Sequence, residues 1–130
     1  MSQDPIRVVL VEDNHVFRES LELLLGVVPD LEVVAAVPDG RSALGVCTEL
    51  KPDVVLMDYR LPELDGVQTT AAIGEACPQA AVVVLTATAE SEEVDALYEA
   101  GAVACLTKDR QLEEIVGAVR DAAGRGAALH

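Results

Sequence analysis

The sequence predicts an α/β protein with a doubly wound, five-stranded parallel sheet and helices on both faces. Two observations lead to this prediction. Five short runs are almost continuously apolar, whereas a strand with one solvated face shows a polar residue at every second position. A segment with apolar residues at helical spacing follows each run. Strands that alternate with amphipathic helices are typical of a parallel sheet covered on both faces.

The five strands are predicted from runs rich in Val, Leu, Ile and Ala. They cover residues 6–11, 31–37, 54–57, 80–85 and 103–107. Aromatic residues make up only 2% of the chain, so these aliphatic side chains have to form the core. The apolar character of the runs indicates strands that are buried on both faces.

Five helices are predicted after these strands, and most of them have a start or an end signal. Gly26 ends the first helix and Gly101 the fourth, because glycine is common just after a helix. Asp39 is the candidate N-cap of the second helix. Asp65 is followed three residues later by a glutamine, which is the spacing of a capping box for the third helix. The fifth helix is predicted from apolar residues at helical spacing from Leu112 onward.

Length and composition predict one globular domain. The chain has 130 residues, of which 51% are hydrophobic and 25% charged. Its formal net charge is −14, which would repel a phosphate backbone, so we do not expect this chain to bind nucleic acid by itself. No apolar run approaches the roughly 18 residues of a membrane helix, and no signal peptide is recognisable. We therefore expect a cytoplasmic protein that does not associate with membranes.

The cysteines favour the same compartment. Their number is odd and their spacing does not match a metal site. We expect free thiols in a reducing cytosol. The three residues are Cys47, Cys77 and Cys105.

Polar residues stand at the ends of four of the predicted strands. Ligands of an open parallel sheet bind beyond the carboxyl ends of its strands. Glu12 and Asp13 follow the first strand, Asp58 the third, Thr86 the fourth, and Lys108 the fifth. In a flavodoxin-like (βα)5 fold with strand order 2-1-3-4-5, these strands are neighbours. The sequence therefore predicts that three carboxylates, a hydroxyl and a lysine face one crevice.

This combination of groups indicates phosphoryl chemistry. Three adjacent carboxylates repel one another, and oxygen ligands suit Mg²⁺, with Mn²⁺ as an alternative. Asp58 is a candidate nucleophile toward phosphorus. Lys108 could pair with the phosphoryl charge, and Thr86 could donate a hydrogen bond to one of its oxygens. Taken singly, Asp13 could be a helix cap, Thr86 a turn residue and Lys108 a solvated lysine; their shared placement favours a site.

Four segments carry a resemblance to a known family. They are VVLVEDN (8–14), VVLMDYRLPELDG (54–66), VVLTA (83–87) and GAVACLTKD (101–109). In this order and spacing, over residues 6–123, they resemble the receiver (REC) domain of a two-component response regulator. The resemblance implies a phosphoacceptor with Mg²⁺-dependent phosphorylation and dephosphorylation chemistry, not a conventional enzyme.

The resemblance also implies roles for individual residues. Asp58 matches the aspartate that takes a phosphoryl group from a sensor histidine kinase. Glu12 and Asp13 match the acidic pair that binds Mg²⁺, together with Asp58 and the backbone carbonyl of Arg60. The family further implies that phosphorylation shifts the conformation and promotes homodimerisation.

The remaining matched residues concern the response to phosphorylation. Thr86 and Lys108 match the residues that contact the phosphoryl group and relay its presence. The family usually has an aromatic residue three positions before the lysine, and this chain has Cys105 there. How the switch is transmitted is therefore open, and we expect Cys105→Tyr to alter phosphorylation-linked dimerisation.

The pair Lys108-Asp109 resembles the NarL/FixJ (LuxR-type) subfamily, whose members usually carry a C-terminal helix-turn-helix domain. We therefore expect a receiver domain over residues 1–124 and the start of a linker at 125–130. DNA would be bound only through the C-terminal domain, and the output would be transcription. Two alternatives are a stand-alone receiver and a pseudo-receiver that acts as a protein-interaction module.

Two enzyme and binding classes fit less well. A haloacid-dehalogenase-type phosphatase also uses an aspartate nucleophile, but that family needs a second acid two residues later, where this chain has Arg60. A dinucleotide-binding domain needs a glycine-rich first turn, whereas the turn EDNHVF is acidic and lacks glycine.

Overall fold

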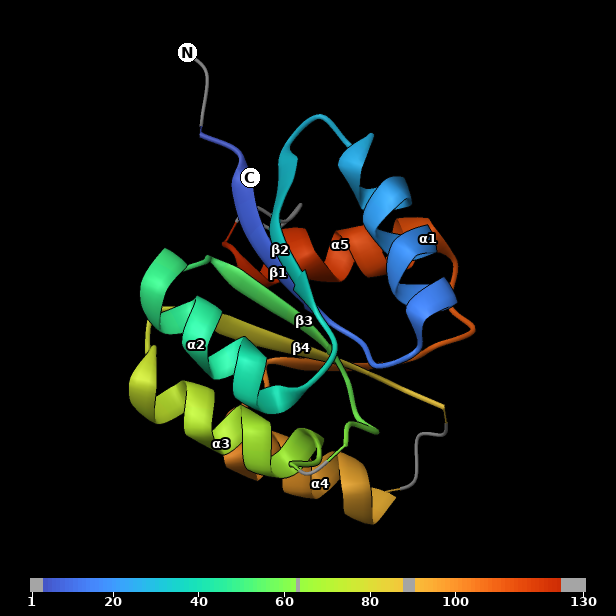
Figure 1. Cartoon of the computed structure of the whole chain (residues 1–130). Helices are drawn as coiled ribbons and strands as arrows, with labels where there is room; N and C mark the ends of the chain where they lie inside the picture. Colours follow the sequence, from blue (N-terminus) through green and yellow to red (C-terminus); the bar gives the residue numbers. More distant parts are fainter. Residues whose placement is uncertain (1–3, 63, 88–90, 125–130) are drawn as a thin grey trace.

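The computed structural model describes residues 4–62, 64–87 and 91–124 (Figure 1). Strands and helices alternate through these residues, as the sequence predicts. The predicted linker, residues 125–130, lies outside the described residues. In chain order the elements are β1 (Ile6–Val11), α1 (His15–Gly26), β2 (Leu31–Val37), α2 (Gly40–Leu50), β3 (Val54–Asp58), α3 (Gly66–Ala76), β4 (Ala81–Thr86), α4 (Ser91–Ala100), β5 (Ala104–Thr107) and α5 (Leu112–Ala122).

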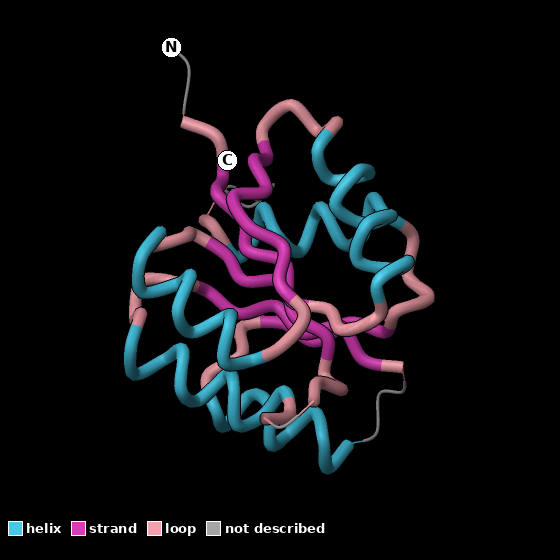
Figure 2. The backbone as a smooth tube through the Cα atoms, viewed as in Figure 1, coloured by secondary structure: helices cyan, strands magenta, loops and turns pink. Residues whose placement is uncertain are grey.

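The sheet has the predicted topology. Its five strands are parallel in the order β2-β1-β3-β4-β5, and they lie side by side through the middle of the molecule (Figure 2). The connection from β2 to β3 crosses over β1, so β1 pairs with β2 on one side and with β3 on the other. A parallel arrangement brings all the carboxyl ends to one edge of the sheet, and this is where a ligand site is expected.

Helices cover both faces of the sheet (Figure 1). Helices α1 and α5 pack on one face, and α2, α3 and α4 pack on the other. Alternate residues of β1 serve the two cores: Val8 and Leu10 belong to the first, and Val9 and Val11 to the second. All four side chains are at most 1% exposed, which explains why β1 reads as a continuous apolar run.

Side-chain caps begin the first three helices. Asn14, not Asp13, caps α1: its side chain accepts a hydrogen bond from the backbone N–H of Phe17. The alternative role of Asp13 as the helix cap is therefore wrong. Asp39 caps α2 as predicted, and Asp65 forms the predicted capping box at the start of α3.

The ends of three strands differ by one residue from the prediction. Strand β3 includes Asp58 and β4 includes Thr86, because both residues still take part in the parallel ladder. Strand β4 begins at Ala81 rather than Ala80. Strand β5 begins at Ala104 rather than Val103, and the Val103 side chain is 52% exposed. Polar residues at the last ladder position cannot be recognised from an apolar run alone.

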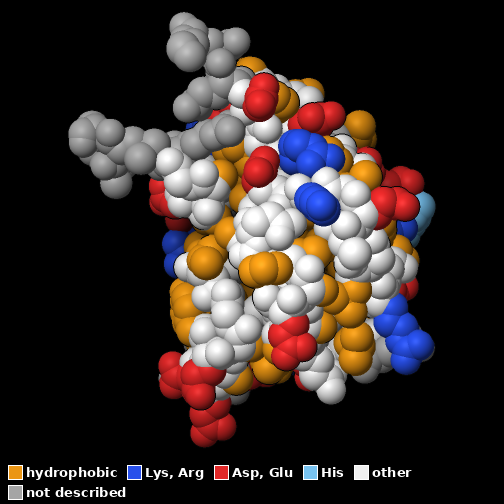
Figure 3. All heavy atoms as spheres, turned by 90° about the vertical axis from the view of Figure 1, so that its left-hand side faces the viewer, with side chains coloured by type: hydrophobic (Ala, Val, Ile, Leu, Met, Phe, Trp, Pro, Cys, Tyr) orange, Lys and Arg blue, Asp and Glu red, His pale blue; other side chains and the backbone are white. Residues whose placement is uncertain are grey.

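Acidic side chains are spread over the surface visible in Figure 3 rather than gathered in one patch. On the face turned to the viewer in Figure 3, acidic side chains lie in several separate places, with apolar and basic groups between them. The described residues contain no helix that is both long enough and apolar enough to span a membrane.

Candidate functional site

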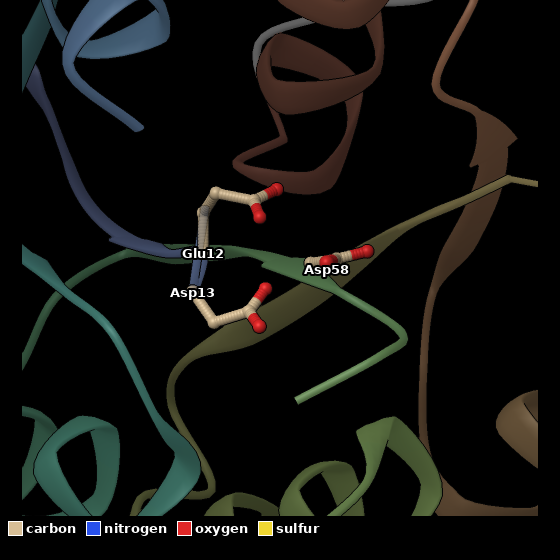
Figure 4. Close-up of side chains that lie close together, drawn as sticks. All are labelled: Glu12, Asp13 and Asp58. Atoms are coloured by element: carbon tan, nitrogen blue, oxygen red, sulfur yellow. The ribbon is translucent and has the colours of Figure 1, made fainter. Parts of the chain in front are cut away.

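Three carboxylates meet at the carboxyl edge of the sheet. Glu12 and Asp13 follow β1, and Asp58 ends β3. One oxygen from each side chain lies within 4.8 Å of the others. In Figure 4 the carboxylates of Glu12 and Asp13 point to the side on which Asp58 lies. The strand crossover produces this cluster, because it makes β1 and β3 neighbours although 45 residues separate Asp13 from Asp58 (58 − 13).

Glu12 is the most enclosed of the three acids, at 1% exposed. Its Oε2 accepts a hydrogen bond of 2.9 Å from the backbone N–H of Asn14. The guanidinium of Arg18 donates to the Glu12 backbone carbonyl at 2.8 Å, so a side chain of α1 fixes the main chain of this residue. Burial raises the pKa of Glu12, as does the charge of Asp58, while the hydrogen bonds from Asn14 and Lys108 act against that rise.

Lys108 supplies the positive charge of the cluster. Its Nζ lies 2.9 Å from Oε1 of Glu12 and 3.4 Å from Oδ2 of Asp58. Its backbone N–H donates to the carbonyl of Thr86 at 2.8 Å, which fixes the main chain just after β5. Burial by itself would lower the pKa of Lys108, but the hydrogen bond and charge of Glu12 and the charge of Asp58 outweigh it, and the pKa is raised.

An aromatic ring completes the surroundings of this lysine. The Lys108 Nζ lies 4.6 Å from the centroid of the Phe17 ring, within the range of a cation–π interaction. In the sequence Phe17 has the helical spacing of a core residue, and it does pack against the core beneath α1. Its second contact was not predicted, because no local pattern relates the first turn of α1 to the end of β5.

Thr86 and Arg60 lie on the flanks of the cluster. In the ladder Asp58 pairs with Leu85, so Thr86 is one position further along the neighbouring strand. Thr86 is 4% exposed and ends β4. Arg60 lies two residues beyond Asp58, in the loop before α3, and its side chain is exposed.

A close backbone approach shapes the loop that carries Arg60. The N–H of Gly66 donates to the carbonyl of Tyr59 at 2.8 Å, which closes the loop between β3 and α3. A Cβ atom at Gly66 would lie 2.9 Å from Cα of Tyr59. Only glycine fits there without a shift of the backbone, so the sequence feature that looks like ordinary loop punctuation is a steric requirement.

Cys105 has an aromatic neighbour on the face of the sheet that α4 covers. It lies in β5, is half-buried, and is close enough to Tyr98 of α4 for that side chain to affect its pKa. Burial raises the pKa of the Cys105 thiol, and the Tyr98 side chain partly offsets this rise. The Tyr98 ring is 48% exposed, so the chain does carry an aromatic side chain at this surface, on α4 rather than on β5.

The donor set fits a hard divalent cation. Three carboxylates provide only oxygen ligands, and Asp13 is exposed while Glu12 and Asp58 are buried. The exposed member would leave room for water ligands, which Mg²⁺ usually retains. The structure thus brings together Glu12, Asp13, Asp58 and Lys108, and it leaves Thr86 and Arg60 beside them.

Comparison with known proteins identifies a family for most of the chain. A family model described as "Response regulator receiver domain" matches residues 8–120. This range includes all the elements of the sheet from the middle of β1 onward and all the site residues described above.

Curated relatives are similar over nearly the same range. YxjL of Bacillus subtilis, an uncharacterized transcriptional regulatory protein, is 36% identical over 129 residues, covering 99% of this chain and 59% of that protein. The transcriptional regulatory protein DegU of Brevibacillus brevis is 31% identical, covering 100% of this chain and 55% of DegU. The chain thus spans little more than half the length of these relatives.

Solved structures share the fold. The signal receiver domain of the putative response regulator NarL from Mycobacterium tuberculosis is 35% identical, with a TM-score of 0.89, covering 94% of this chain and 98% of that one. A LuxR-family two-component response regulator from Aurantimonas sp. SI85-9A1 is 31% identical, with a TM-score of 0.86, covering 95% of this chain and 89% of that one.

Proposed function

This chain belongs to the receiver domain family of two-component response regulators, and on that premise we propose that it accepts a phosphoryl group on Asp58 from a sensor histidine kinase. The family is not one of conventional enzymes. The observation that supports Asp58 most strongly is its place at the end of β3. There it is 5% exposed and faces both the Lys108 ammonium and the carboxylates of Glu12 and Asp13.

The proposed step is a transfer between a phosphohistidine and a carboxylate. An oxygen of Asp58 attacks phosphorus and forms an O–P bond, while the N–P bond to the kinase histidine breaks. The imidazole leaves with the bonding electron pair and takes up a proton from solvent. The product is an acyl phosphate, and its later hydrolysis releases inorganic phosphate and restores the Asp58 carboxylate.

The three acids are the proposed holders of Mg²⁺, with Mn²⁺ as an alternative. Glu12, Asp13 and Asp58 would bind it through carboxylate oxygens, and Arg60 would add its backbone carbonyl. When bound, the ion would neutralise the acids and the charge on the phosphoryl oxygens. Glu12 meanwhile keeps its hydrogen bond from the Asn14 N–H, which orients its carboxylate in the absence of any ion.

Lys108 and Thr86 are the proposed sensors of the phosphoryl group. The Lys108 ammonium already points at Asp58, so it would pair with the negative oxygens that the reaction places there. Thr86 would donate its hydroxyl hydrogen to one of them. These contacts favour the active conformation only in the phosphorylated domain. A difference in binding free energy of about 5.5 kcal/mol would convert a 1:99 mixture of active and inactive conformations to 99:1.

For the whole protein we propose control of transcription. The relatives similar to this chain include transcriptional regulatory proteins, and this chain spans only part of them. The output would be phosphorylation-linked homodimerisation and DNA binding by a C-terminal helix-turn-helix domain. This chain itself has a net charge of −14, which disfavours direct contact with DNA phosphates.

The test is phosphorylation by a small donor. The wild-type chain and Asp58→Asn are incubated with acetyl phosphate, with Mg²⁺ or with a chelator, and the intact mass is measured. Phosphoryl transfer from acetyl phosphate breaks its O–P bond and releases acetate. We expect the wild type to gain the mass of one phosphoryl group when Mg²⁺ is present, and not when the chelator is present. No gain, under conditions in which a control receiver domain reacts, would favour the pseudo-receiver alternative.

A further inference from the structure

We propose that Phe17 is a positioning residue that seats the Lys108 ammonium for phosphoryl transfer to Asp58; this inference rests on the proposed function. The ammonium has three neighbours from three separate elements. Two are carboxylates, Glu12 after β1 and Asp58 at the end of β3. The third is the aromatic ring of Phe17 in the first turn of α1, whose centroid is 4.6 Å from Nζ.

The ring is held in place by its own helix. The Phe17 N–H donates to Oδ1 of Asn14 at 2.9 Å, so the N-cap of α1 sets the position of this residue. The side chain is partly buried and packs against the core cluster that includes Leu21 and Leu25 on the inner face of α1. Phe17 therefore presents a fixed surface to Lys108, which reaches it from the end of β5.

The ring differs from the two carboxylates in one chemical respect. Glu12 and Asp58 are also the proposed ligands of the divalent cation, so binding that cation would occupy their oxygens and weaken their attraction for the ammonium. The Phe17 ring attracts a cation through its π face and has no oxygen to give to a metal. It can hold the Lys108 Nζ at the same place whether or not the acids are neutralised.

Retaining the ammonium matters because phosphoryl transfer depends on positioned charge. Negative charge on the transferring group is stabilised only by cations that are already in place when it develops. Without the ring, Lys108 would keep its length and charge. It would lose an attractive contact that does not depend on the carboxylates. Given the range of cation–π energies, removing the ring should slow phosphorylation by about two- to thirty-fold at saturating Mg²⁺.

The experiment compares three variants of the same helix. Phe17→Leu keeps an apolar side chain but removes the ring, and Phe17→Tyr restores a ring. Leu24→Ala is the matched control, because Leu24 also lies on α1 but is 48% exposed and outside the site. The rate constant for phosphorylation by acetyl phosphate is measured at saturating Mg²⁺, with thermal unfolding of each variant alongside. We expect a slow Phe17→Leu, recovery in Phe17→Tyr, and a wild-type rate in Leu24→Ala.

A second measurement does not depend on activity. Protons on Cε of Lys108 should show a ring-current shift in NMR spectra, assigned by its absence in Lys108→Arg. The shift should persist in the wild type when Mg²⁺ is added, disappear in Phe17→Leu and return in Phe17→Tyr. Its loss on addition of Mg²⁺ would overturn the claim that the ring retains the ammonium.

The outcomes separate the two proposals. If the wild type is phosphorylated and Phe17→Leu reacts equally fast, or if Phe17→Tyr is as slow as Phe17→Leu, the positioning role of Phe17 is wrong while the proposed function stands. If the wild type takes up no phosphoryl group, the proposed function fails, and the NMR shift then decides by itself whether Phe17 seats Lys108.

Discussion

Lys108 holds its ammonium nitrogen 2.9 Å from Oε1 of Glu12, which is closer than its 3.4 Å approach to Oδ2 of Asp58. Glu12 is 1% exposed, whereas the Lys108 side chain is 28% exposed. The lysine therefore compensates a buried carboxylate at the same time as it faces the proposed phosphoacceptor. We thus propose a functional task for Lys108 beside its structural one, and the two can be separated by experiment.

Removing Lys108 should destabilise the protein most strongly without a divalent cation. Lys108→Ala leaves Glu12 and Asp58 close together with no positive charge between them, at a cost of roughly 1–3 kcal/mol after allowance for solvent screening. Mg²⁺ should recover much of this loss, because it binds the folded acids and not the unfolded chain.

Urea unfolding with and without Mg²⁺ measures this effect. Arg110→Ala is the control, since Arg110 makes only an exposed ion pair with Glu114 at 2.8 Å and its loss should cost about 0.5 kcal/mol or less. Equal losses for Lys108→Ala in both conditions would contradict the view that lysine and metal compensate the same carboxylates.

Gly66→Ala should destabilise the protein, whereas Gly74→Ala in the same helix should not. A Cβ at Gly66 would lie 2.9 Å from the Tyr59 backbone, and such overpacking costs about 1–3 kcal/mol. Among the described residues, no atom outside the surrounding turns of α3 lies within 4 Å of a Cβ at Gly74, so alanine there should stabilise α3 by about 0.5–1 kcal/mol. Chemical denaturation of both variants gives the comparison, and equal free energies of unfolding would show that the loop yields without cost.

Cys105→Tyr should change phosphorylation-linked dimerisation. Cys105 lies beside Tyr98 of α4, so the larger side chain of a tyrosine in its place should displace the Tyr98 ring. The association constant is measured by analytical ultracentrifugation with Mg²⁺, with and without beryllofluoride as a phosphoryl mimic. Cys105→Ser is the matched control, because serine keeps a side chain of similar size beside Tyr98. If Cys105→Tyr associates as the wild type does in both states, this position is not part of the switch.

Cys47 should be inert toward alkylating reagents in the folded protein. Burial raises the pKa of its thiol to about 12, and the neighbouring Cys77 adds to the rise. Because the thiolate is the reactive form, only about one molecule in ten thousand would carry it at pH 8. Cys77 is 2% exposed and should also be protected, whereas Cys105 is half-buried.

Intact mass after iodoacetamide treatment tests the protection of these thiols. We expect one adduct at most in the native protein and three in urea, where every cysteine is solvated. Rapid addition of three adducts under native conditions would show that the face of the sheet covered by α2 and α3 opens frequently.

Local patterns were sufficient for the elements, and the fold class they indicate supplied the topology. The apolar runs and helix signals predicted all ten elements, with strand ends shifted by one residue at Asp58, Ala80, Thr86 and Val103. The strand order was confirmed as well. The elements are accessible from sequence because periodicity and capping involve residues within a few positions of one another. The strand order was expected from the flavodoxin-like fold class instead, because it pairs residues that lie far apart in the chain. The roles of the site residues come from the resemblance and remain predictions.

The sequence by itself determined the α/β sheet, its strand order and the acids and lysine at its carboxyl edge. Only the tertiary structure decided which groups touch. It placed the Lys108 ammonium over the Phe17 ring, brought Lys108 nearer to Glu12 than to Asp58, and put Cys105 beside Tyr98. The physical reason is distance along the chain, because 91 residues separate Phe17 from Lys108 (108 − 17). Their contact arises only when α1 packs on the sheet to which β5 belongs.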